Sequence, residues 1–291
     1  MIADQADFIT PHITDAHTLD YPCFTHAAHW YQRIIPQVCE YELPRWAPIH
    51  IGRFALDISP TRHVVMLWFA ALLCIITTLL ALRAHNRKTR EGKAPSGLGN
   101  GLEALVLYLR NEIVLPNVGA HGNGYVPFLL TLFFFILFAN LLGLIPYGST
   151  ATGNISVTGT LAIITFIVVE VAGMKKGAKA YINTIVFWPH DMSLGMKIFI
   201  SPILTPIELI GKFTKPFALA IRLFANMVSG HVVLLGLLSL IFTFATWILV
   251  PLPIAMALGI SMIELFVAFL QAFVFTLLSA VFIGLIREGG H

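Results

Sequence analysis

The chain has 291 residues, of which 57% are hydrophobic and 11% are charged. A soluble domain has about 45–50% apolar and about 25% charged residues. The mean hydropathy is +0.81, and several apolar runs are long enough to cross a bilayer. This composition excludes a soluble enzyme, a disordered tail, a collagen-like fibre and a disulfide-rich secreted module. The net charge of +3 is small and its basic residues cluster in loops, so we expect no nucleic acid partner.

Residues 1–62 form a polar, mildly acidic segment that is rich in histidine. Its beginning contains aspartates and no long apolar stretch, so we expect no signal peptide. We interpret this segment as an extramembrane extension with short interfacial helices. Cys23 and Cys39 could form a disulfide or remain two thiols. No CxxC or HxxxH spacing is present, so a metal site is not expected from these cysteines and the histidines His12, His17, His26, His29 and His50.

The first predicted span covers residues 64–82, contains no charged residue and is followed at once by a basic cluster. The cluster consists of Arg83, Arg87, Lys88, Arg90 and Lys93. By the positive-inside rule, we expect it on the inner side and the N-terminal extension outside. Residues 94–101 predict a turn-rich linker. Residues 102–115 carry three charges among leucines and predict an interfacial helix that ends at Pro116.

Two further spans are predicted at residues 125–147, which include Asn140, and at 155–173. The loop between them has no positive charge, whereas Lys175, Lys176 and Lys179 follow the third span. By the positive-inside rule, these lysines predict the same orientation as the first basic cluster, with the basic loops on the inner side. Because Glu170 lies close to the lysines in sequence, we expect its side chain to reach the inner interface.

The last third of the chain predicts two long helices, at residues 197–244 and 253–286. At 1.5 Å per residue they would be about 70 and about 50 Å long, while the hydrocarbon core is about 30 Å thick. We therefore expect a strongly tilted helix hairpin with its turn at residues 247–251. The C-terminus, after Arg287, is expected inside. The fold class is an all-α polytopic membrane protein with about five membrane helices and an interfacial helix, and residues 63–291 form its membrane domain.

Ionisable and polar groups at membrane depth are costly, and the predicted hairpin contains several of them. They are Glu208, Lys212, Lys215, Arg222, Asn226 and His231 on the first helix, and Glu264 and Gln271 on the second. Glu208 and the two lysines either extend to the inner interface from a nearby helix end or have a function within the membrane. Arg222 has no helix end close enough for this escape, so it is a candidate functional residue.

Helical periodicity places Arg222 and Asn226 on one face and His231 roughly opposite. Glu264 and Gln271 are seven residues apart and share a face. An antiparallel hairpin would bring Gln271 to Arg222 and Glu264 to His231. A histidine in a membrane helix is commonly a hydrogen-bonded packing residue. A histidine facing a glutamate at the same depth favours a hydrated proton path, because histidine titrates near neutral pH.

Arg222 cannot carry a proton, because a guanidinium does not deprotonate in proteins. As a fixed positive charge, it stabilises the ionised form of an approaching carboxylate and so makes that carboxylate release its proton. The acidic residues of this chain are expected at positions other than beside Arg222. We therefore expect the carboxylate on a partner subunit.

The segment FALAIRLFANMVSGH at residues 217–231 closely resembles subunit a of the F-type ATP synthases. Three further motifs occur in the order and spacing of that family: Asn140 in FANLLGLIPYG, Glu208 in ILTPIELIGKFTKP and Gln271 in FLQAFVFTLL. The resemblance covers most of residues 62–287 and leaves the N-terminal extension outside it. Long paired tilted helices are also a property of that family.

The resemblance implies that Arg222 faces the essential carboxylate of the c-ring and separates two aqueous half-channels. It places Glu208 at the inner exit, His231 and Glu264 at the outer entry, and Asn140 on the proton path. Some relatives carry the outer pair as glutamate then histidine, and here the order is exchanged. Asn226 and Gln271 would support Arg222.

The resemblance further implies a non-catalytic subunit of a proton-transporting ATP synthase. Its expected partners are the c-ring, the peripheral-stalk b subunits and the remaining complex. The chain contains no GxxxxGK[ST] motif, so nucleotide chemistry would belong to partner subunits. No cofactor or metal is expected. The implied location is the bacterial inner membrane, although the sequence leaves an organellar membrane and Na⁺ in place of H⁺ open.

Other functional classes fit the sequence less well. An ion-coupled secondary transporter with its own substrate would show internal repeats and broken helices in both halves, whereas the polar groups here concentrate in the second half. A haem-binding membrane enzyme would need paired ligands in the membrane, and only His231 qualifies. A structural scaffold gives no reason for an arginine in lipid.

Overall fold

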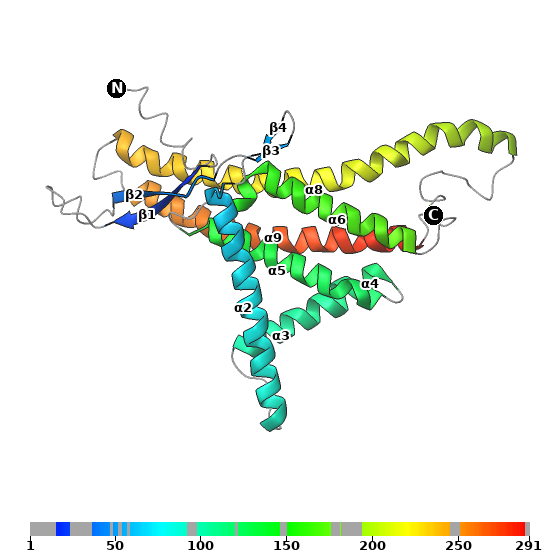
Figure 1. Ribbon diagram of the computed structural model, residues 1–291, viewed down its shortest axis with the longest axis horizontal. Helices are drawn as coiled ribbons and strands as arrows, with labels where there is room; N and C mark the ends of the chain where they lie inside the picture. The colour runs from blue at the N-terminus through cyan, green and yellow to red at the C-terminus, as the bar shows by residue number, and fades with distance from the viewer. Residues whose placement is uncertain are drawn as a thin grey trace. The chain divides into compact units, whose positions relative to one another are not determined.

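The structure is a computed structural model, and five of the helices that it describes are long and apolar enough to cross a membrane. It describes residues 16–23, 37–46, 49–51, 54–56, 59–91, 98–119, 122–145, 150–175, 181, 194–244 and 251–288. The five helices are α2 (Arg62–Glu91), α5 (Val126–Gly143), α6 (Ile155–Lys175), α8 (Leu194–Phe244) and α9 (Pro251–Glu288) (Figure 1). The chain is therefore a multi-pass membrane protein of the all-α class, as expected.

The two C-terminal helices have the length that the sequence predicts. Helix α8 has 51 residues and α9 has 38, so they extend over about 75 and about 57 Å. Both are longer than the hydrocarbon core, which is about 30 Å thick. The three prolines inside α8 do not interrupt its helical assignment. The expected turn at 247–251 lies largely outside the described residues.

The chain divides into two compact units, and α2, α5, α8 and α9 each contribute to both. Unit 1 consists of Met1–Leu73, Leu137–Asn154 and Phe224–Phe269. Unit 2 consists of Cys74–Ile136, Ile155–Leu223 and Leu270–His291.

The N-terminal extension contains strands where short interfacial helices were expected. Strand β1 (Thr18–Cys23) pairs antiparallel with β2 (Gln37–Glu42), and β3 (Ile49–Ile51) pairs with β4 (Phe54–Leu56). That expectation is wrong for these segments, which contain the β-branched and aromatic residues that favour strands.

The register between β1 and β2 places the two cysteines of the extension out of direct opposition. Cys39 faces Tyr21, and Cys23 faces Gln37. The cysteine side chains lie outside those described, so the choice between a disulfide and two thiols remains open. His12, His26 and His29 also lie outside the described residues.

Within unit 1, the extension is attached to the start of α2. The backbone N–H of Arg62 donates to the carbonyl of Ala16 (2.9 Å), and its Nη2 donates to Oγ1 of Thr18 (3.3 Å). The Nδ1 of His17 lies 3.3 Å from the carbonyl of Pro60. Arg62 is only 6% exposed. These contacts fix the extension to the first span at its N-terminal end.

The predicted interfacial helix is longer than the sequence pattern indicates. Helix α3 (Leu98–Tyr108) continues through a π-helical segment, η3 (Leu109–Val114), into α4 (Leu115–Val118). The predicted linker 94–101 is therefore helical from residue 98, and the helix does not end at Pro116. Pro116 lies in the first turn of α4, where a missing N–H is tolerated. The helix ends before Gly119, whose φ of 79° favours glycine.

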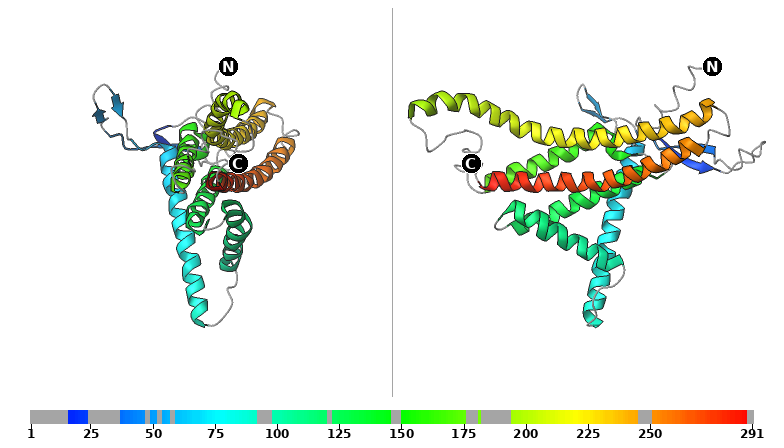
Figure 2. Two further views of the ribbon diagram at one scale, coloured as in Figure 1. Left: turned by 90° about the vertical axis from the view of Figure 1, so that its right-hand side faces the viewer. Right: turned by 180° about the vertical axis from the view of Figure 1, so that it is seen from behind.

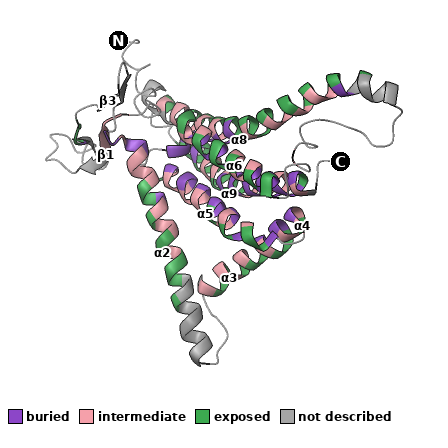
Figure 3. Ribbon diagram, turned by 45° about the vertical axis from the view of Figure 1, so that its right-hand side comes forward, coloured by how far each residue is buried: buried purple, intermediate pink, exposed green. Residues whose placement is uncertain are grey.

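The apolar core of unit 2 joins the end of this interfacial helix to the packed faces of α5, α6 and α9 (Figure 3). Its buried members are Val114, Val118, Val126, Leu129, Val169, Ala172, Ala280, Ile283 and Ile286. In contrast, α2 shows mostly exposed and half-buried positions in Figure 3, and only 11% of its apolar window is buried. The surface of α2 is therefore available to lipid or to partner subunits.

The C-terminal part of α9 packs against α4 at a glycine. A Cβ atom on Gly284 would overlap the carbonyl oxygen of Asn117. One turn further on, Nη1 of Arg287 donates to the carbonyl of Val118 (3.0 Å), and its guanidinium lies 5.5 Å from the ring centre of Tyr125. The cation thus lies at the carbonyl end of a helix, where the helix dipole favours it.

This packing predicts different effects for alanine at two glycines of α9. Gly284→Ala is expected to lower the free energy of unfolding by about 1–3 kcal/mol, because the new methyl group forces the two backbones apart. At Gly259 an added Cβ meets no atom within 4 Å, so Gly259→Ala is expected to be neutral or stabilising by up to about 1 kcal/mol. Thermal unfolding in detergent tests this, and equal melting temperatures for the two variants would contradict it.

Candidate functional site

A buried hydrogen-bond network connects α5, α9 and a short 3₁₀ turn, η5 (Ala151–Gly153), in unit 1. The Nδ2 of Asn140 donates to the carbonyl of Ala268 on α9 (3.2 Å), and Oγ1 of Thr152 donates to Oδ1 of Asn140 (2.7 Å). Asn140 and Thr152 are both fully buried. Because buried polar groups need partners, this network fixes η5 against the two helices.

Thr150 brings the same loop to the histidine of α8. Its hydroxyl donates to the carbonyl of Gly143 (3.4 Å) and lies 3.5 Å from Nδ1 of His231. An added Cβ on Gly143 would lie 2.5 Å from this hydroxyl oxygen. Gly143 therefore leaves the space in which Thr150 reaches His231.

Glu264 on α9 lies against α8 at Gly230, the residue before His231. A Cβ atom on Gly230 would overlap the carboxylate oxygen of Glu264, so the absence of a side chain at Gly230 admits this carboxylate. We call Asn140, Thr150, Thr152, His231 and Glu264 the outer polar site, and all five belong to unit 1. The sequence did not indicate Thr150 and Thr152. The sequence feature that could have pointed to them is the presence of two hydroxyl residues in an uncharged loop between two predicted spans.

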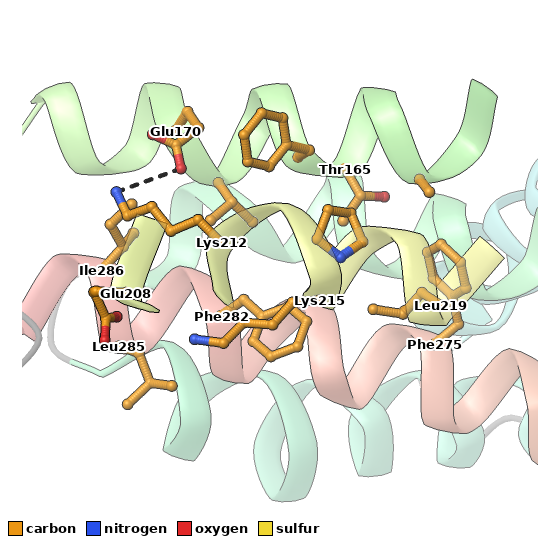
Figure 4. Close-up of a pocket in the computed structure, with 14 residues that line it drawn as sticks. Thr165, Glu170, Glu208, Lys212, Lys215, Leu219, Phe275, Phe282, Leu285 and Ile286 are labelled. Carbon is orange, nitrogen blue, oxygen red and sulfur yellow. Dashed lines mark ion pairs between the residues drawn. The ribbon is translucent and has the colours of Figure 1, made fainter. Parts of the chain in front are cut away.

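A second group of polar residues surrounds a cavity of about 250 Å³ in unit 2. The titratable residues that line it are Glu170 from α6 and Glu208, Lys212 and Lys215 from α8 (Figure 4). Helix α9 contributes Phe275, Phe282, Leu285 and Ile286. Figure 2 shows α8 and α9 running alongside each other. We call this the inner cavity.

Glu170 binds partners with both of its carboxylate oxygens, and its expected position at the inner interface stays a prediction. Oε1 lies 3.6 Å from Nζ of Lys212, and Oε2 accepts a hydrogen bond from the Tyr181 hydroxyl. The Lys212 ammonium also lies 4.8 Å from the ring centre of Tyr181. The side chains of Lys212 and Glu170 are only 12% and 15% exposed. Glu170, Lys212 and Tyr181 thus form one cluster.

The hydrogen bond to Glu170 raises the pKa of Tyr181 to about 12, with further contributions from burial and the carboxylate charge. Tyr181 therefore keeps its proton at physiological pH and remains a donor. Because the pKa is raised, the stabilisation that it contributes is complete below about pH 10, the usual range of a tyrosine. It is lost as the pH rises toward 12.

The long helix α8 carries Arg222 near the middle of its apolar segment, Ser201–Leu237, and this arginine is exposed on the chain. The surface of α8 in unit 2 also exposes large apolar side chains: Ile203, Ile207, Ile210, Phe213, Phe217 and Ile221. Gln271 is buried, at 1% exposure, and Asn226 is half-buried. The expected proximity of Arg222 and Gln271 remains a prediction.

The charged residues of α8 lie on one face. Glu208, Lys212, Lys215 and Arg222 are separated by four, three and seven residues, and these spacings return to the same side of a helix. The face that lines the inner cavity therefore continues in the direction of Arg222. Among the described residues, no three histidine, cysteine or acidic side chains gather in a group that could hold a metal ion.

Residues 64–284 match the family model described as "ATP synthase A chain". The chain is 42% identical over 275 residues to "ATP synthase subunit a" of Chloroherpeton thalassium, covering 94% of this chain and 74% of the relative. It is 46% identical to "ATP synthase subunit a" of Myxococcus xanthus, with 81% and 75% covered.

The N-terminal extension is included in this similarity. The match to "ATP synthase subunit a 2" of Chlorobium luteolum is 41% identical over 289 residues and covers 98% of this chain and 77% of the relative. The resemblance seen in the sequence motifs stopped near residue 62. The family model begins at a similar residue, Val64, whereas the match to this relative also includes residues of the extension.

The network around Asn140 predicts that its two polar residues act together. Asn140→Ala and Thr152→Val are each expected to lower the free energy of unfolding by about 1–3 kcal/mol, because each leaves a buried polar partner unsatisfied. The double variant should lose less than the sum of the two by at least about 0.5 kcal/mol. Thermal unfolding in detergent measures all three.

Thr160→Val is the matched control, because the exposed Thr160 hydroxyl donates to the carbonyl of Ser156 in its own helix and, within the described part of the chain, to no other segment. It is expected to change the free energy of unfolding by less than about 0.5 kcal/mol. Additive losses at Asn140 and Thr152 would show that the network does not couple them.

Proposed function

The chain belongs to the ATP synthase A chain family, and from this premise we propose that it is the proton-translocating stator subunit of an F-type ATP synthase. It has two half-channels that load and unload carboxylates of a rotating c-ring. The exposed position of Arg222, within the apolar segment of α8, carries the proposal. A lone cation at this depth is too costly unless an opposite charge meets it.

The counter-charge comes from a partner subunit. Arg222 is exposed next to Ile221, and the large apolar side chains of α8 extend this surface along the helix. A surface of this kind fits an apolar helix that carries a single carboxylate. When the carboxylate of a c-ring subunit reaches the guanidinium, its ionised form is stabilised and its proton leaves.

The outer polar site is the proton entry. His231, Glu264 and the hydroxyl of Thr150 offer donor and acceptor groups within one unit. Histidine exchanges protons near neutral pH, and a neighbouring carboxylate can take part in the transfer. Asn140 and Thr152 hold the loop that carries Thr150 and orient this path.

The inner cavity is the exit. Glu208 lines it on the same face of α8 as Arg222, so a proton released at Arg222 has an acceptor on that face. Asn226 and Gln271 support the arginine. The driving force is about 2.3 kcal/mol per proton for each 100 mV of membrane potential. The chain itself carries out no covalent catalysis beyond proton transfer, and ATP chemistry belongs to other subunits.

The chain assembles with the c-ring, the peripheral-stalk b subunits and the rest of the ATP synthase in a bacterial inner membrane. Residues 1–62 lie on the outer side and the C-terminus lies in the cytoplasm. The basic residues after the spans support this orientation: Arg83, Arg87, Lys88, Arg90 and Lys93 follow α2's apolar segment, and Lys175, Lys176 and Lys179 follow that of α6.

Arg222→Ala is expected to abolish ATP-driven acidification of inverted membrane vesicles, compared at equal assembly of the complex. Without the fixed charge, the two half-channels are no longer separated and the carboxylate is no longer forced to release its proton. Arg110→Ala is the matched control, because among the described residues this arginine bonds to nearby asparagine side chains, Asn111 and Asn123. Normal pumping by Arg222→Ala would refute its role and favour a transporter.

Gly230→Ala tests the outer entry. The added methyl group displaces the Glu264 carboxylate from its position against Gly230, so ATP synthesis driven by an imposed proton gradient is expected to fall several-fold. Gly236→Ala on the same helix serves as the control, because an added Cβ there meets no atom within 4 Å. If both variants synthesise ATP equally well, Glu264 is not part of the entry.

A further inference from the structure

The inner cavity contains two carboxylates and two ammonium groups whose pairing is selective. Lys212 is four residues after Glu208 on α8. A glutamate followed at this spacing by a lysine is a favourable ion pair within a helix. In the structure, however, Lys212 reaches across to Glu170 on α6, with 3.6 Å between Nζ and Oε1 (Figure 4). Glu170 and Glu208 therefore compete for one lysine.

Two contacts favour Glu170 in this competition. The Tyr181 hydroxyl donates to Oε2 of Glu170 and so fixes the carboxylate that faces Lys212. The Tyr181 ring lies 4.8 Å from the Lys212 ammonium, within the range of a cation–π interaction. Because Tyr181 keeps its proton to about pH 12, both contacts persist at physiological pH.

The remaining charges of the cavity complete the arrangement. Lys215 lies 5.6 Å from the ring centre of Phe282 on α9, and Figure 4 shows it turned away from Glu170. Of the described residues that line the cavity, those from α9 are apolar, so the titratable groups around Glu208 are Glu170, Lys212 and Lys215. Holding Lys212 at Glu170 removes one of the two cations from the vicinity of Glu208.

We propose that Glu170 is a positioning residue that holds Lys212 away from Glu208, which keeps Glu208 able to exchange protons with the inner side. This proposal rests on the function proposed above. It assigns the ion pair between α6 and α8 a role in proton exit, separate from its contribution to stability. Loss of the Glu170 charge would let Lys212 turn to Glu208 and hold it in its ionised form.

The test measures ATP-driven acidification of inverted vesicles, in which protons are taken from the medium on the inner side, as a function of the pH of that medium. Glu170→Gln is expected to shift the pH profile lower by about one unit, equivalent to a tenfold loss of proton occupancy at a given pH. Lys212→Met removes the competing cation, so its profile should not shift lower. The double variant Glu170→Gln with Lys212→Met should likewise show no shift to lower pH, because the cation that would turn to Glu208 is absent.

This asymmetry separates positioning from stability. If the ion pair were merely structural, Lys212→Met would reduce assembly as much as Glu170→Gln does, because Lys212→Met leaves the half-buried Glu170 carboxylate without its cation. In that case neither variant would shift the pH profile. That result would overturn the proposal. Glu112→Gln and Lys175→Met, both at exposed positions of unit 2, control for the loss of a charge elsewhere.

Two further comparisons complete the design. If Glu170→Gln does not assemble, Glu170→Asp replaces it, because the shorter side chain weakens the ion pair with Lys212. Glu170→Asp should shift the pH profile in the same direction by a smaller amount. The absence of any shift would contradict the proposal. If the native complex pumps, Arg222→Ala does not pump, and Glu170→Gln pumps with an unchanged pH profile, only the role of Glu170 is refuted. Absence of pumping by the native complex would refute the proposed function itself.

Discussion

The dominant constraint on this protein is the cost of placing ionised groups in a hydrocarbon layer. Helix α8 carries charged residues along a segment longer than the layer is thick, and the structure accommodates them in different ways. Lys212 is paired with a carboxylate of α6. His231 lies beside a threonine hydroxyl from a loop. Arg222 is exposed on the chain, and we propose that its counter-charge comes from a partner subunit.

The two polar regions depend on opposite kinds of packing. In the outer polar site, glycines leave space that admits polar side chains: Gly230 lies beside Glu264, and Gly143 beside Thr150. In the inner cavity, large apolar residues of α9 leave a space in which α8 and α6 share charges. Close packing favours fixed hydrogen bonds, whereas the space of the cavity allows ionised groups to pair selectively. This difference agrees with the separate entry and exit roles that we propose.

Elements outside the long helices stabilise both units. The extension binds the first turn of α2 through Arg62, which is buried although it begins a membrane helix. At the other end of the chain, Arg287 binds the carbonyl end of α4. In each case a cation that would be costly in lipid forms hydrogen bonds with backbone or hydroxyl oxygens. Arg62 and Arg287 thus connect the ends of the membrane helices to neighbouring segments through hydrogen bonds.

The sequence by itself determined the number of the membrane helices and their approximate positions, because apolar runs and basic loops are local properties that no tertiary contact has to create. It also identified Arg222, His231 and Glu264 as candidates, since polar residues are conspicuous in apolar helices. It did not predict the strands of the extension, the helix through Pro116, or the contacts of Thr150 and Glu170. Only the tertiary structure decided these, because a hydroxyl, a carboxylate or a proline takes its role from the partners that distant segments bring to it.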